Sequence, residues 1–108
     1  MTLSALATAA ATTARAQEAA AVEKVLGLLQ AAHHGEAARA QALRMNDRLW
    51  HAILQAVGQP ASPLALPMRQ GLAALGAAVL REQARPQPNL DLLVAINQRI
   101  LAGLAARH

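Results

Sequence analysis

The side chains of this sequence that could do acid–base or metal chemistry are few and scattered. It has four histidines, six acidic residues and no cysteine, which excludes thiolate metal sites, cysteine nucleophiles and disulfides. Apart from the single pair Asp47 and His51, no two of these residues that include a histidine have the i, i+4 spacing that places two metal ligands on one helix face. His33 and His34 are adjacent, so on a helix they would point about 100° apart. We therefore expect no metal and no cofactor.

Motifs of enzyme active sites are also missing. The glycines are isolated in the sequence, so neither a phosphate-binding loop nor a dinucleotide fingerprint can be drawn. No acidic residue forms a motif with a serine or threonine nucleophile. We expect a protein that acts by binding a partner and catalyses no reaction.

Several residues have the types that are enriched at binding surfaces. Trp50 is the only aromatic side chain; we favour it as the central core anchor, and the alternative is a partner-binding hot spot. Asn46 and Asn97 stand on or beside apolar stripes, where a buried amide must be hydrogen-bonded and can fix helix register or cap a partner group. Arginine is favoured at interfaces. The candidate partner-binding residues are Asn46, Arg48, Trp50, Asn97 and Arg99.

The elements that must position these residues are helices. Alanine dominates a hydrophobic fraction of 55%, and phenylalanine and tyrosine are absent, a balance that favours helices over sheet. Apolar residues recur with helical period in four segments, 17–33, 36–57, 67–84 and 90–106. Short connections predict an all-α fold, a small antiparallel bundle of three to four main helices in one domain over 1–108. An extended helical hairpin that completes its core only on binding is the alternative.

Local signals mark where the helices end. Gly58 is placed as a C-terminal cap, Pro67 suits a first helical turn and Asn89 is an expected N-cap. Gly71 and Gly76 weaken the third helix, which predicts close packing of another helix there. An extension of the first helix backwards through Leu3 and Leu6 is an alternative to a start near residue 17. Residues 1–14 are rich in alanine and threonine with few large anchors, so we expect this N-terminal segment to be loosely ordered or mobile.

Charge and hydropathy narrow the partner class. The net charge is +4, but the arginines are scattered and no aromatic platforms separate them, so we do not expect nucleic-acid binding. No run approaches the roughly 20 apolar residues that span a bilayer. No Lys or Arg precedes Ala14 and threonines dilute the N-terminal apolar residues, unlike a signal peptide. We expect a cytoplasmic protein without membrane insertion.

Three stretches, in order, resemble the flagellar biosynthesis regulator FlaF family. Asn46-Asp47-Arg48-Leu49-Trp50 is similar to the family's Asn-x-Arg-Leu-Trp signature. The stretch 64–79, with Met68-Arg69 inside it, resembles a Leu-Pro-x-x-Leu-Arg segment and the helix after it, although Pro67 falls later than the family's proline. The stretch 93–104 is similar to the Ile-Asn-Arg-x-Ile-x-x-Gly-Leu ending. The third helix often carries a tryptophan in the family, and Ala77-Ala78 lie in that region here.

This resemblance implies a cytoplasmic factor needed for flagellin production and export, and it adds Arg69 to the candidate partner-binding residues. Flagellin is the implied partner, and the regulator FlbT is a second one. Two alternatives stay open: a post-transcriptional regulator that works on RNA with FlbT, and a structural subunit whose helices pair in a homo-oligomer. Convergence in space of Arg39, Arg44, Arg48 and Arg99 would favour RNA, and concentration-dependent stability would favour the oligomer.

Overall fold

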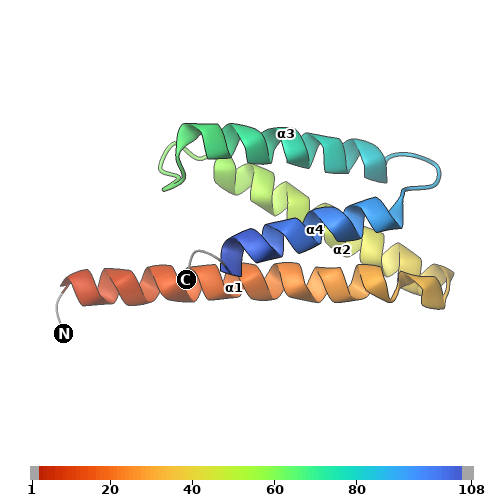
Figure 1. Ribbon diagram of the computed structural model, residues 1–108, viewed down its shortest axis with the longest axis horizontal. Helices are drawn as coiled ribbons and strands as arrows, with labels where there is room; N and C mark the ends of the chain where they lie inside the picture. The colour runs from red at the N-terminus through yellow and green to blue at the C-terminus, as the bar shows by residue number, and fades with distance from the viewer. Residues whose placement is uncertain (1–2, 106–108) are drawn as a thin grey trace.

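The protein is built from four α-helices in a computed structural model that describes the backbone of residues 3–105 and the side chains of residues 16–104. The helices are α1 (Leu3–Gln30), α2 (Glu36–Val57), α3 (Leu66–Gln83) and α4 (Leu90–Ala105), with a short 3-10 turn, η1 (Ala32–His34), after α1. Successive helices run in opposite directions (Figure 1). Within the described residues there is no strand, and the predicted all-α antiparallel bundle is confirmed.

The arrangement of the helices leaves α1 and α3 on opposite sides of the molecule. α1 packs against both α2 and α4, and α3 packs against α2. Figure 1 shows α4 lying along the C-terminal half of α1, while the N-terminal half of α1 extends past the end of α4. This extension explains the elongated outline of 51 × 25 × 19 Å.

The first helix differs most from its predicted bounds. It begins at Leu3 instead of residue 17 and ends at Gln30 instead of residue 33. The early start follows because alanine, which dominates this stretch, has the highest helix propensity of all residues and needs no large apolar anchors to form a helix. Gly35, with φ of 146°, turns the chain into α2, a conformation that favours glycine. The predicted mobility of 1–14 stays a prediction; residues 1–2 and the side chains before Ala16 lie outside the described residues.

The other three helices match the predicted segments to within one residue. Asn89 caps α4, since its Oδ1 accepts a hydrogen bond from the Leu92 N–H at 3.1 Å. Pro67 lies in the first turn of α3. Gly58 follows the end of α2 but keeps right-handed helical angles, φ −79° and ψ −11°, so it does not form the left-handed cap that glycine often supplies.

The close approach predicted from the glycines of α3 holds for one of the two. A Cβ at Gly76 would lie 2.6 Å from Leu54 Cδ2 of α2, whereas a Cβ at Gly71 would meet nothing within 4 Å. Gly76 therefore lets α3 settle onto α2, and Gly71 makes no such contact. The buried core lies around this contact and between α1, α2 and α4; it comprises Val25, Leu29, Ala32, Ala42, Trp50, Val79 and Leu93.

No helix within the described residues is both long enough and apolar enough to cross a membrane.

Candidate functional site

A chain of buried hydrogen bonds joins the two sequence stretches that carry an asparagine. The Trp50 Nε1–H of α2 donates to Asn97 Oδ1 of α4 at 3.0 Å. Asn97 Nδ2 in turn donates to Asn46 Oδ1, back on α2, at 2.8 Å. Trp50 and Asn46 are completely buried and Asn97 is 1% exposed, so these bonds form away from water, where an unpaired polar group is costly.

The chain continues into α3 through a residue that the sequence reasoning did not single out. Asn46 Nδ2 donates to Gln83 Oε1, and Gln83 Nε2 donates to the Leu43 carbonyl at 2.9 Å. Gln83 stands four residues after Val79 and so continues the apolar stripe of α3, the one signal that could have found it. The amides and the indole together fix how α2, α3 and α4 sit on one another.

The six candidate partner-binding residues therefore divide into two groups. Trp50, Asn46 and Asn97 face the interior, which agrees with the favoured interpretation of Trp50 as a core anchor. Arg48 and Arg99 are exposed. Arg69 is partly buried: its Nη1 donates to the Gln59 carbonyl at 3.3 Å, while its Nε is buried without a hydrogen-bond partner. Partner contact by any of the six stays a prediction, and the two exposed arginines are placed to make it.

An apolar groove of about 790 Å³ lies at the end of the bundle where α2 meets α3. All four helices and the loop before α3 contribute to it. Its polar members include Glu18 of α1 and Arg99 of α4. Its apolar lining includes Val22, Ile53, Val57, Leu64, Met68, Leu72, Ile100 and Leu104. This groove is the candidate functional site.

The groove forms because the apolar faces of the helices extend beyond the buried core, so that their last residues are not covered by another helix. On α3, Val79 is completely buried but Met68, eleven residues earlier and on the same helix face, is 42% exposed. On α4, Leu93 is buried while Ile100 and Leu104 are only partly covered. The apolar faces of α3 and α4 thus run from the core into the groove. An apolar surface left open in this way is typical of a site for a protein partner.

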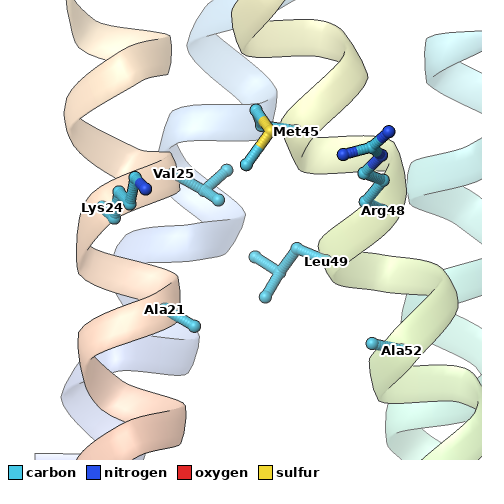
Figure 2. A pocket seen from close by; sticks show the side chains of 7 residues that line it. All are labelled: Ala21, Lys24, Val25, Met45, Arg48, Leu49 and Ala52. Atoms are coloured by element: carbon cyan, nitrogen blue, oxygen red, sulfur yellow. The ribbon is translucent and has the colours of Figure 1, made fainter.

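A second, shallower hollow of about 360 Å³ lies on the seam between α1 and α2. Figure 2 shows Val25 of α1 and Met45 and Leu49 of α2 pointing into the space between the helices, with Lys24 and Arg48 on either side. Both cationic side chains are exposed. This hollow is apolar in the middle and positively charged at its edges.

Among the described residues, two acidic side chains form local contacts with basic neighbours. His51 Nδ1 lies 3.4 Å from Asp47 Oδ2, an exposed pair on α2. The Asn89 backbone N–H, which donates to Glu82 Oε2, together with Arg85, lowers the pKa of Glu82. The contacts of Glu82 with Arg85 and Asn89 stabilise the loop between α3 and α4. Within the described part of the chain, no group of three histidine, aspartate or glutamate side chains could hold a metal ion.

A comparison with protein-family models identifies the family of this chain. The family model described as flagellar protein FlaF matches residues 4–104. The chain belongs to the FlaF family. No curated protein and no solved structure matches it. The match confirms the resemblance inferred from the three sequence stretches. In this FlaF-family fold, the asparagines of the first and third stretches meet in one buried hydrogen-bond chain.

Proposed function

We propose that this FlaF-family protein binds flagellin, as a secretion chaperone or as a regulator of flagellin synthesis and export in the cytoplasm. The observation that supports the proposal is the apolar groove of about 790 Å³ between the four helices. The family match supports a flagellar role. The protein would act by holding its partner, without catalysing a reaction.

The groove has the character expected for a helical segment. Amphipathic helices bind in apolar grooves through anchors spaced i, i+3 or i+4, and i+7. Side chains of four different helices face the groove, so an inserted helix would extend the bundle that the chain leaves incomplete. Met68 suits such a site because its unbranched side chain adapts to different partners.

The test is a calorimetric titration of the protein with flagellin from the same source. Ala56 is an exposed alanine of α2 that lines the groove, so Ala56→Glu places a charge inside it. Ala102 is an exposed alanine of α4 outside the groove, and Ala102→Glu is the matched control. We expect a stoichiometric complex that Ala56→Glu weakens at least about tenfold and Ala102→Glu leaves unchanged.

Two results would contradict the proposal: no complex at about 50 µM of the folded protein, or equal loss of binding in both variants. The first result would make FlbT or RNA the next partner to titrate. Truncation of Trp50 is not a suitable test, since Trp50 is fully buried and its loss would destabilise the fold by about 3–5 kcal/mol.

A further inference from the structure

The groove and the seam hollow form one continuous apolar surface. Three residues line both of them: Ala21 of α1, and Leu49 and Ala52 of α2. Two of the three are alanines, so the surface between the hollows is low. A helical ligand that enters the groove can therefore continue along the α1–α2 seam, over the two alanines and against the apolar side chain of Leu49. We call this surface the track.

The charged residues of the track are mostly cationic. Lys24 and Arg48 flank the seam end and Arg99 lines the groove, against a single carboxylate, Glu18. Among the side chains that the structure describes, none of the three cations forms a salt bridge. Their charges are available to a partner.

Lys24 and Arg48 each directly follow a carboxylate in the chain, but neither forms a salt bridge with it within the described residues. Asp47 is two residues from Met45, and Glu23 is two residues from Ala21. Two residues correspond to about 200° around a helix, so both carboxylates lie on faces turned away from the seam. Asp47 is also close to His51.

We propose that the track binds an amphipathic helix whose carboxylates lie over Lys24 and Arg48 while its apolar face enters the groove. The proposal rests on the proposed function, because it takes the groove as the partner site, and it goes further by stating the chemistry and orientation of the bound segment. The wide groove takes the large apolar anchors, and the shallow seam takes the acidic end. Complementary charge selects this ligand over a cationic helix of equal hydrophobicity.

Two synthetic helices of about 18 residues, long enough to be helical in water, provide the test. Both carry the same leucine face, and the first turn contains two glutamates in one and two lysines in the other. We expect the glutamate peptide to bind the full-length protein about tenfold more tightly at low salt, with the difference shrinking as salt is raised.

A matched pair of variants locates the effect. Arg48→Glu reverses a charge on the track, and Arg81→Glu makes the same change at an exposed position of α3 outside it. We expect Arg48→Glu to reduce glutamate-peptide binding about five- to tenfold and Arg81→Glu to have no effect. Equal binding of the two peptides, no binding of either, or equal effects of the two variants would overturn the proposal.

Flagellin titrated against the same variants separates this proposal from the proposed function. If Ala56→Glu weakens flagellin binding but the two peptides bind equally, the charge selection is wrong and the proposed function stands. If the glutamate peptide binds selectively but flagellin does not bind, the proposed selection of an acidic amphipathic helix stands and flagellin is the wrong partner.

Discussion

Removing the amide of Asn97 should be among the most damaging single changes outside the apolar core. Asn97 accepts the Trp50 Nε1–H through Oδ1 and donates through Nδ2 to Asn46 Oδ1. Asn97→Ala therefore leaves one buried donor on Trp50 and one buried acceptor on Asn46 without partners. Each such group costs about 1–3 kcal/mol, so the free energy of unfolding should fall by about 2–6 kcal/mol.

That loss is large against the roughly 5–15 kcal/mol of a typical domain, and it corresponds to a fall in melting temperature of at least about 8 °C. Trp50 is the only tryptophan and is fully buried, so its fluorescence reports urea unfolding directly, with circular dichroism as a second probe. Gln98→Ala, at the exposed neighbouring position, is the control and should stay within about 0.5 kcal/mol.

A double-mutant cycle tests whether the asparagines act together. Because Asn97→Ala already breaks the bond to Asn46, the combined loss in Asn46→Ala/Asn97→Ala should be less than the sum of the single losses by about 0.5–3 kcal/mol. A loss of less than 0.5 kcal/mol for Asn97→Ala alone, or strict additivity in the cycle, would refute the account of a connected network.

Four further substitutions test local features of the fold. Gly76→Ala should destabilise the fold by about 1–3 kcal/mol, because its Cβ would overlap Leu54, whereas Gly71→Ala, with open space around it, should stabilise it by about 0.5–1 kcal/mol; equal effects in thermal melts would show that the helices do not approach as described. Asn89→Ala should cost about 1 kcal/mol through the lost N-cap, measured by urea unfolding, and an unchanged midpoint would rule out the cap. The folded-state pKa of Glu82 lies below its usual value, chiefly through the bond from the Asn89 N–H, so its stabilisation is present above the unfolded-state pKa and is lost as pH falls through the folded one; Glu82→Gln should flatten the dependence of unfolding free energy on acid pH, and an unaltered pH profile would contradict this.

The sequence predicted the helices well because their signals are local. Breaks at Gly35, around Gly58 and before Asn89, with helical apolar spacing between them, are enough to place α2, α3 and α4 to within a residue. The start of α1 was predicted too late because the reasoning required large apolar anchors, whereas alanine alone sustains the helix back to Leu3.

The functional surface could be predicted only in part, because exposure depends on how the helices are placed in three dimensions. The asparagine pattern indicated polar groups among apolar ones, but it could not show that Asn46 and Asn97 would satisfy each other inside the protein. Likewise, Met68 and Val79 belong to one stripe by spacing, yet only one of them is covered. The groove and the seam hollow meet at residues that come from both α1 and α2, so the sequence of either helix alone does not reveal that they are continuous.

The most direct test of partner binding in the groove is a methyl NMR spectrum of the isoleucine- and methionine-labelled protein with flagellin added. Ile53, Ile100 and Met68 line the groove, whereas Ile96 does not, so the spectrum contains its own control. The account predicts that the first three methyl signals shift or broaden in proportion to bound flagellin and that Ile96 changes little. Unchanged signals at saturating flagellin, or a change confined to Ile96, would contradict it.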